Sequence, residues 1–318
     1  MTTVFSKFTG IVFCVLLVTR ALAQPDGKAL FNGEQSPGHA EGIKNKILDI
    51  VYAPKSAAQK LDIYFPSEGN GPFPVIIFIH GGGFEMGDKK SFELHPALQG
   101  LKHGYAVVSV NYRLSGEAIF PAQIQDVKAA IRFLRANART YKLNPDKFAT
   151  WGASAGGNLS AMAGTTGDVA EFDDASLGNI QQSSKVQAVV DWFGPIAFNE
   201  MDQQFKARGK GRADHNNAAS PESKLLGKAI TAIPELVKRA NPSTYISKND
   251  PPFFIEHGME DPLVPTEQSE NFYTELVKVL GHDKVTLVLL KDTSHGGKQF
   301  NSQENLDKVY AFLDKALQ

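Results

Sequence analysis

One serine in this sequence stands where nucleophilic chemistry is possible. Ser154 lies in the run GASAGG at 152–157, directly after an apolar stretch and before a helix-like stretch. A serine on a tight strand-to-helix turn needs small residues two positions away on each side, and Gly152 and Gly156 meet this need. The start of the following helix favours negative charge that develops there. We interpret Ser154 as a nucleophile; a plain glycine-rich turn is the alternative.

A second glycine-rich run, HGGGF at 80–84, follows the apolar stretch at 75–80. Its three glycines leave backbone N–H groups unshielded, and donors of this kind stabilise an oxyanion by about 3–4 kcal/mol each. A phosphate-binding loop is a rival interpretation, but the sequence has neither GK[ST] here nor a GxGxxG that opens a helix. Together with Ser154, the run favours an oxyanion hole over a phosphate loop or a merely flexible loop.

A serine hydroxyl is a weak nucleophile until a base takes its proton. His295 follows the last predicted strand, 285–290, so it would lie at the same edge of the sheet as Ser154. His80 and His257 also end predicted strands, and for these two we expect structural hydrogen bonds. We therefore interpret His295 as the base.

The base in turn needs a carboxylate that orients it. Asp261 follows the predicted strand 253–257 and would lie at the edge that carries His295. Its neighbour Glu260 is one alternative. Asp191 is another, because an acid after that earlier strand can reach the same histidine. We interpret Asp261 as the acid and keep both alternatives.

These residues need a sheet that presents its strand ends along one edge. Two alternating runs, 47–52 and 61–65, predict an antiparallel edge pair. Continuous apolar runs then predict strands at 75–80, 105–111, 148–151, 186–191, 253–257 and 285–290. Helices are predicted near 91–102, 121–140, 155–164, 266–280 and 301–317. This alternation indicates an α/β fold with a mostly parallel sheet that helices cover on both faces.

Three further segments complete the predicted organisation. Residues 1–23 resemble a secretory signal peptide with cleavage after Ala23, although an uncleaved anchor or a buried N-terminal element are alternatives. Residues 24–46 read as a flexible arm, and 47–318 as one domain. Its stretch 195–250 is polar, helix-prone and interrupted by prolines, so we expect a small cap insertion. We expect a secreted or periplasmic protein without a stable membrane span in its mature form.

Composition and charge exclude several classes of function. The chain is 42% hydrophobic and 21% charged, which is ordinary for a globular protein. Its 33 Lys and Arg balance 34 Asp and Glu without a basic run, so nucleic acid is not an expected partner. The only cysteine, Cys14, would leave with the signal peptide, which excludes thiol and disulfide chemistry from the mature chain. The acidic residues at 168–174 lack EF-hand spacing, and we expect no metal and no cofactor. The oligomeric state stays open.

The order Ser154, Asp261, His295, with HGGGF upstream, resembles the α/β-hydrolase fold over nearly all of 47–318. More narrowly, the chain resembles the esterase and lipase branch that carries HGGG, near the hormone-sensitive-lipase group and the BD-FAE carbohydrate esterases. Ala153 departs from the hormone-sensitive-lipase pattern, which has Asp there. The segments DWFGP at 191–195 and HGMEDPLVP at 257–265 look closer to the BD-FAE type.

The resemblance implies a serine carboxylic-ester hydrolase that forms an acyl-enzyme and needs no cofactor. It implies small-molecule or polysaccharide substrates, such as acetyl or feruloyl esters of carbohydrates. It also implies that the backbone N–H groups of Gly82, Gly83 and Ala155 hold the oxyanion, with Phe84 as an alternative donor.

Aromatic residues near the predicted catalytic edge are candidate substrate contacts. These are Phe84, Trp192 and Phe193, for which plain core packing is the alternative. The stretch 195–250 carries few long apolar runs, which favours short acyl or aryl esters over long-chain lipid. A serine peptidase or amidase, a true lipase and a catalytically silent binding protein are the alternative functions.

Overall fold

The computed structural model describes residues 1–2 and 38–317, and all elements below belong to the unit formed by residues 35–318. The predicted signal peptide beyond its first two residues, including Cys14, lies outside the described residues. An eight-stranded sheet forms the centre of this unit, in the order β1-β2-β4-β3-β5-β6-β7-β8. The strands are β1 (Lys46–Val51), β2 (Lys60–Tyr64), β3 (Phe73–Ile79), β4 (Ala106–Val110), β5 (Leu143–Ala153), β6 (Ala188–Trp192), β7 (Phe253–Gly258) and β8 (Val285–Leu290).

The pairing of the strands confirms the predicted mostly parallel sheet. Strands β1 and β2 are antiparallel, as is the pair β2 and β4, whereas β4, β3, β5, β6, β7 and β8 run parallel to their neighbours. Because these six strands are parallel, their carboxyl ends lie along one edge, and the loops that follow them share that edge.

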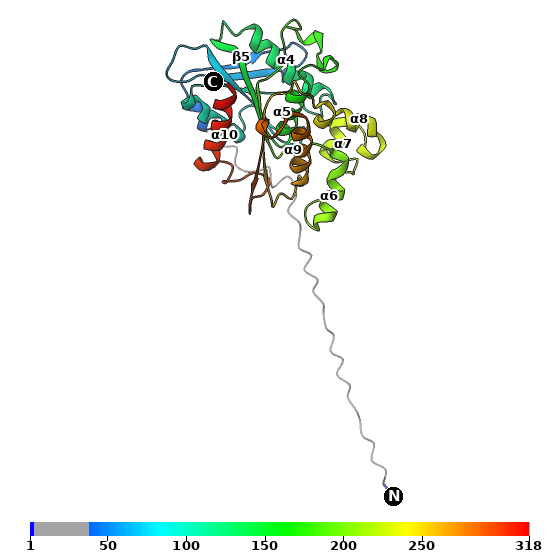
Figure 1. Cartoon of the computed structure of the whole chain (residues 1–318). Helices are drawn as coiled ribbons and strands as arrows, with labels where there is room; N and C mark the ends of the chain where they lie inside the picture. The colour runs from blue at the N-terminus through cyan, green and yellow to red at the C-terminus, as the bar shows by residue number, and fades with distance from the viewer. Residues whose placement is uncertain (3–37, 318) are drawn as a thin grey trace. The chain divides into compact units, whose positions relative to one another are not determined.

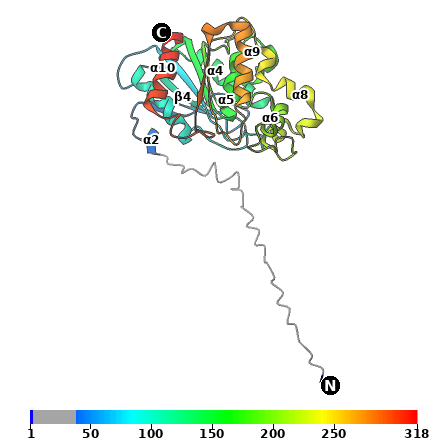
Figure 2. The same cartoon turned by 60° about the horizontal axis from the view of Figure 1, so that its bottom comes forward.

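Helices cover both faces of the sheet, as Figure 2 shows with α10 on one side and α5 and α9 on the other. On β3, Val75 and Ile77 belong to the apolar cluster that includes residues of α4, α5 and α9, while Ile76 and Phe78 belong to the cluster that includes residues of α3 and α10. The α-helices are α2 (Gly38–Glu41), α3 (His95–Leu98), α4 (Ala122–Ala136), α5 (Ala155–Thr165), α6 (Met201–Arg208), α7 (Pro221–Leu226), α8 (Pro234–Arg239), α9 (Glu267–Leu280) and α10 (Gln303–Leu317).

Two local predictions differ from the structure. The helix expected at 91–102 is three short pieces, the 3₁₀ helix Phe92–Leu94, α3, and the 3₁₀ helix Gln99–His103. Pro96 stands at the start of α3, where proline is tolerated but cannot continue a preceding helix. The arm predicted at 24–46 contains the helix α2 within its described part.

The segment 195–250 connects β6 to β7 and contains α6, α7 and α8 (Figure 1). It contacts two loops at the carboxyl edge of the sheet. Lys224 Nζ lies 2.6 Å from Glu85 Oε1, just after the HGGGF run. The backbone N–H of Arg212 donates to the carbonyl of Pro262 at 3.1 Å, beside Asp261. The segment therefore reaches both loops in which the sequence predicts site residues.

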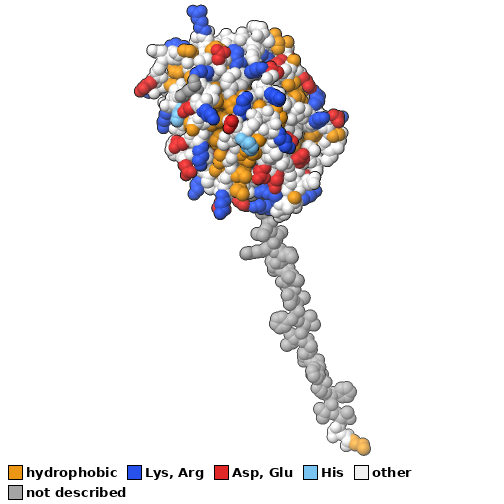
Figure 3. Space-filling view, in the orientation of Figure 1, with side chains coloured by type: hydrophobic (Ala, Val, Ile, Leu, Met, Phe, Trp, Pro, Cys, Tyr) orange, Lys and Arg blue, Asp and Glu red, His pale blue; other side chains and the backbone are white. Residues whose placement is uncertain are grey.

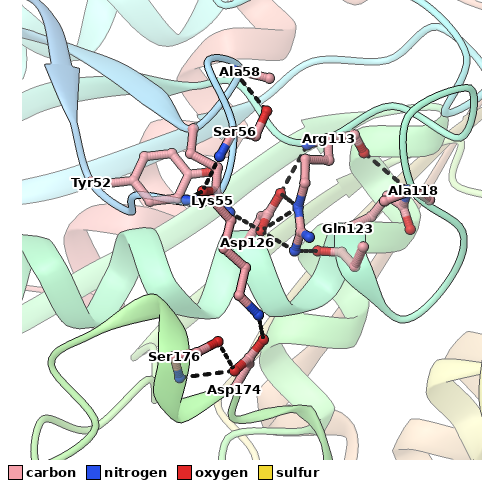
Figure 4. A network of polar contacts seen from close by, with 12 residues as sticks. Tyr52, Lys55, Ser56, Ala58, Arg113, Ala118, Gln123, Asp126, Asp174 and Ser176 are labelled. Carbon is pink, nitrogen blue, oxygen red and sulfur yellow. Dashed lines mark hydrogen bonds and ion pairs between the residues drawn. The ribbon is translucent and has the colours of Figure 1, made fainter.

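A buried polar network joins α4 to the loop between β1 and β2 (Figure 4). Asp126 on α4 is fully buried. Its Oδ1 accepts from Gln59 Nε2 at 2.7 Å and from Arg113 Nη2 at 2.7 Å, and its Oδ2 accepts from Arg113 Nε at 2.9 Å. The backbone N–H of Arg113 adds a further bond at 2.9 Å. This network connects the antiparallel edge of the sheet to a helix through the Asp126 carboxylate, which binds both the Gln59 amide and the Arg113 guanidinium.

Charged side chains of both signs are interspersed over the face of the protein seen in Figure 3, in keeping with the near-zero net charge. In the part of the chain that the structure describes, the helices are all too short or too polar to cross a lipid bilayer.

Candidate active site

Ser154 stands between β5 and α5 in a strained backbone conformation. Its φ of 56° and ψ of −121° are rare for a residue with a side chain, and strain of this kind gathers at functional sites. The turn is tight because the chain passes close to itself. A Cβ on Gly152 would lie 2.0 Å from the carbonyl oxygen of Gly156, and one on Gly156 would lie 2.0 Å from that of Ile79. Both glycines are therefore sterically required, as the spacing predicts.

The glycine loop 81–83 follows β3 at the same edge. Gly82 has a φ of 101°, and a Cβ there would lie 2.2 Å from the carbonyl oxygen of Met86. No described residue accepts a hydrogen bond from the N–H of Gly82 or Gly83. Ala155 is the first residue of α5, where helix N–H groups have no partner within the helix. These three donors are available to a ligand.

The structure brings His295 and Asp261 together. His295 Nδ1 lies 2.6 Å from Asp261 Oδ2, and both side chains are buried. The other ring nitrogen, Nε2, is buried and has no hydrogen-bond partner in the described part of the chain. An imidazole held through Nδ1 with Nε2 open has the arrangement of a general base.

Asp261 is held as a carboxylate by its surroundings. Its Oδ1 accepts from the backbone N–H groups of Leu263 at 2.8 Å and Val264 at 2.9 Å. Burial alone raises the pKa of Asp261. The charge of His295 and hydrogen bonds from His257 and His295 outweigh burial, so the pKa of Asp261 lies well below its usual value. Asp261 therefore stays ionised across the range in which imidazoles titrate.

The two alternative acids lie elsewhere. Asp191 is fully buried and accepts from the backbone N–H of Gly194 at 3.0 Å, and its Oδ2 has no partner among the described residues. Burial raises the pKa of Asp191 to about 6. Glu260 is exposed and pairs with Lys210 at 2.5 Å. Asp261 is the one of the three that is hydrogen-bonded to His295.

Two further residues lie beside the site. The sequence did not indicate Glu93, whereas His257 makes the structural hydrogen bonds expected of it, with Ser269 and Val264. Glu93 Oε2 accepts from the backbone N–H of Gly81 at 2.8 Å. Burial raises the pKa of Glu93, an effect that the bond from Gly81 and the charge of His295 offset only in part. His257 Nε2 lies 3.2 Å from Asp261 Oδ2. The spacing of four residues between His257 and Asp261 was the available signal, whereas Glu93 belongs to no recognised motif.

The candidate aromatic contacts differ in their surroundings. Phe84 is 1% exposed and packs edge-on against Phe198. Trp192 is also buried, with its ring 5.2 Å from that of Phe300. Phe193 alone touches the site, since its ring centroid lies 4.6 Å from that of His295. All three side chains are buried, and substrate contact by any of them stays a prediction.

Among the described residues, no group of three His, Cys, Asp or Glu side chains is arranged to hold a metal ion. The site is therefore described by its own side chains and backbone donors.

The comparisons with known proteins agree on the family. The family model BD-FAE matches residues 61–276. The Mycobacterium tuberculosis protein "Probable carboxylic ester hydrolase LipM" is 32% identical over 234 residues, which is 73% of this chain and 52% of that protein. The chain spans little more than half the length of the curated relatives it matches.

Two solved structures resemble the chain over most of its length. A truncated form of a carbohydrate esterase from gut microbiota has a TM-score of 0.78 and 33% identity, covering 86% of this chain and 96% of that one. A bifunctional GH43-CE protein of Bacteroides eggerthii has a TM-score of 0.76 and 35% identity, covering 86% of this chain and 38% of that one.

Proposed function

Because the chain belongs to the BD-FAE family, with the α/β-hydrolase fold, we propose that it is a serine ester hydrolase acting on short acyl or aryl esters carried by carbohydrate. The observation that carries this proposal is the 2.6 Å contact of His295 Nδ1 with Asp261 while His295 Nε2 stays open. The strained turn at Ser154 and the free N–H groups of Gly82 and Gly83 lie at the same edge of the sheet and supply the other parts that acyl transfer needs.

The proposed reaction has two steps. Ser154 Oγ attacks the ester carbonyl as its proton passes to His295 Nε2, and Asp261 balances the imidazolium charge. The N–H groups of Gly82, Gly83 and Ala155 bind the oxyanion. The leaving alcohol takes the proton from His295, which leaves an acyl-enzyme. Water then attacks that ester while His295 takes its proton. His295 returns this proton to Ser154 Oγ as the bond to the acyl group breaks, which releases the acid and restores the free enzyme.

The side chains of residues 195–250 favour the proposal that the substrate carries a short acyl group and not a long one. A lid that docks on lipid needs a continuous exposed apolar face. The apolar residues Phe198, Met201 and Phe205 are all buried instead. None of the exposed large hydrophobic side chains in the described chain lies within 195–250. The similarity to a carbohydrate esterase from gut microbiota supports a sugar as the alcohol part.

An ester series tests the proposed substrate. The purified protein is assayed on p-nitrophenyl esters from acetate to palmitate, on acetylated xylan and feruloyl esters, and on emulsified triolein. We expect kcat/KM to be greatest at acetate to butyrate, with release of acetate or ferulate from the carbohydrate esters. A preference for palmitate with activation at an oil interface would make the protein a lipase. Hydrolysis of peptide or amide substrates alone would support a peptidase.

Loss of the serine tests the proposed chemistry. Ser154→Ala should reduce kcat/KM by about 10⁴-fold or more, because the covalent step is removed. Ser160→Ala, on a buried serine of the same helix region, is the matched control and should keep activity. A fluorophosphonate should label the wild type and not Ser154→Ala. Near-normal hydrolysis by Ser154→Ala would refute the assignment.

Export is a further part of this proposal, supported by the signal-peptide pattern of residues 1–23. N-terminal sequencing of the protein recovered from the medium or periplasm should begin at Gln24. An intact Met1 on a cytoplasmic product would contradict it.

A further inference from the structure

A second buried imidazole contacts the carboxylate that holds His295. His257, in β7, is fully buried. Its Nε2 lies 3.2 Å from Asp261 Oδ2, the same oxygen that is 2.6 Å from His295 Nδ1. One carboxylate oxygen is therefore flanked by two histidines, of which only His295 has an open nitrogen.

The neighbours of His257 determine where its proton lies. Nε2 is 3.0 Å from the carbonyl oxygen of Val264, which can only accept, so Nε2 must carry hydrogen. Nδ1 is 2.7 Å from Ser269 Oγ, which can donate to it. A neutral His257 with its proton on Nε2 satisfies both contacts. That N–H donates to the carbonyl of Val264, and Asp261 Oδ2 lies 3.2 Å from the same nitrogen.

The other groups around His257 do not contact Asp261 Oδ2 in its place. Asp191 interacts electrostatically with His257 and Phe193 presents its ring edge at 6.4 Å between centroids. No hydrogen bond joins Asp191 to His257 in the described part of the chain. Asp261 Oδ1 is held by two backbone N–H groups. Apart from His295, His257 is thus the one described basic side chain within ion-pair distance of the carboxylate.

We propose that His257 is a positioning residue for the triad, an inference that rests on the proposed function. Its Nε2–H fixes Asp261 Oδ2 toward His295 and disperses part of the carboxylate charge. During acylation the proton of Ser154 Oγ moves to His295 Nε2, His295 keeps its Nδ1 proton, and Asp261 stays ionised. The proton on His257 Nε2 does not move. His257 thereby favours the state in which the Nδ1 proton stays on the protonated His295 and is not transferred to Asp261.

Three variants test this role by kinetics. His257→Phe keeps a ring and removes the donor, and should lower kcat by about 10- to 100-fold with KM nearly unchanged. His257→Gln offers an amide N–H in place of the imidazole and should recover part of the loss. Ser269→Ala removes the bond to Nδ1 and should have the smallest effect. His103→Phe, a stacked histidine on the other face of the sheet, is the matched control and should equal wild type.

A pH profile separates positioning from mere support of the fold. Without the His257 donor, Asp261 carries more negative charge and stabilises the imidazolium more strongly. The acid limb of kcat/KM should therefore move to higher pH in His257→Phe and partly return in His257→Gln. Lower kcat with a lower Tm and an unmoved acid limb would overturn the proposal, because His257 would then only support the fold. Wild-type kinetics in His257→Phe and Ser269→Ala would overturn it as well.

Proton NMR gives a readout that needs no turnover. The downfield resonance of the proton between His295 Nδ1 and Asp261 should shift or broaden in His257→Phe and be partly restored in His257→Gln. An identical resonance in wild type and all three variants would overturn the proposal. If the wild type hydrolyses no ester, the proposed function fails, whereas this resonance still decides the role of His257. Should His257→Phe not fold, His257→Gln and Ser269→Ala provide the same comparison.

Discussion

Two buried aspartates, Asp126 and Asp261, are each held by several hydrogen bonds but differ in what their partners can do. Asp126 is paired with Arg113, whose guanidinium keeps its charge at any ordinary pH. Asp261 is paired with His295, whose imidazole can both accept and release a proton. Arg113 directs its Nε and Nη2 to Asp126, whereas His295 keeps Nε2 without a partner. The first pair is a structural bond, and the second leaves one atom for chemistry.

A third buried carboxyl shows what happens without a cationic or imidazole partner. Glu256 lies on β7 one residue before His257, and neither of its carboxyl oxygens has a hydrogen-bond partner of good geometry in the described chain. Burial raises the pKa of Glu256 to about 8, an effect that Asn305 and Lys308 offset only in part. Burial raises the pKa of both Asp261 and Glu256, and only Asp261 has partners that outweigh this effect.

The largest loss of activity is expected from changing Asp261, because its partner His295 takes part in the proposed reaction. Asp261→Asn should lower kcat by about 10³- to 10⁴-fold, because the amide favours the wrong tautomer of His295. Asp191→Asn and Glu260→Gln should stay much closer to wild type, since neither acid is hydrogen-bonded to His295. Steady-state kinetics on p-nitrophenyl acetate measure all three. A severe defect in Asp191→Asn with a mild one in Asp261→Asn would reverse the assignment.

Disrupting the structural pair of Asp126 and Arg113 should lower the stability of the protein and leave the catalytic rate nearly unchanged. Asp126→Asn leaves Arg113 without its carboxylate and should lower the free energy of unfolding by about 3 kcal/mol. Activity per folded molecule should change little, because neither residue reaches the site. Urea denaturation measures the loss. Asp168→Asn, in an exposed pair with Lys185, is the control and should cost less than about 1 kcal/mol. Equal costs for both variants would remove the distinction between buried and exposed pairs.

The smallest effect should come from the carboxyl without a partner. From the ordinary glutamate value of 4.5 up to about pH 8, folded Glu256 keeps a proton that the unfolded chain has lost. Wild-type stability should therefore fall as pH rises through this window. Glu256→Gln removes the titration and should be more stable by about 1–2 kcal/mol at pH 8, since its amide still lacks partners.

Thermal unfolding of wild type and Glu256→Gln from pH 4 to 9 measures that gap. Glu304→Gln, on the exposed face of α10, is the control and should run parallel to wild type. A constant difference between Glu256→Gln and wild type would mean that Glu256 is ionised in the folded protein.

The sequence by itself predicted the features that depend on local chemistry. The strands and most helices follow from apolar runs, because a strand buried on both faces must be apolar throughout. The turn at Ser154 was predicted from Gly152 and Gly156, since only glycine allows the backbone to approach within the distances found. The broken helix at 91–102 was missed because its apolar residues keep helical spacing through the interruption at Pro96.

The tertiary structure alone decided which acid meets His295. Asp191, Glu260 and Asp261 all follow strands at one edge, so sequence position does not separate them. The loop after β7 turns so that the backbone of Leu263 and Val264 binds Asp261 Oδ1 and aims Oδ2 at His295. The contacts of His257 and Glu93 also depend on how loops from different strands pack. Such contacts join residues far apart along the chain, and side-chain direction there is determined by packing instead of by local sequence.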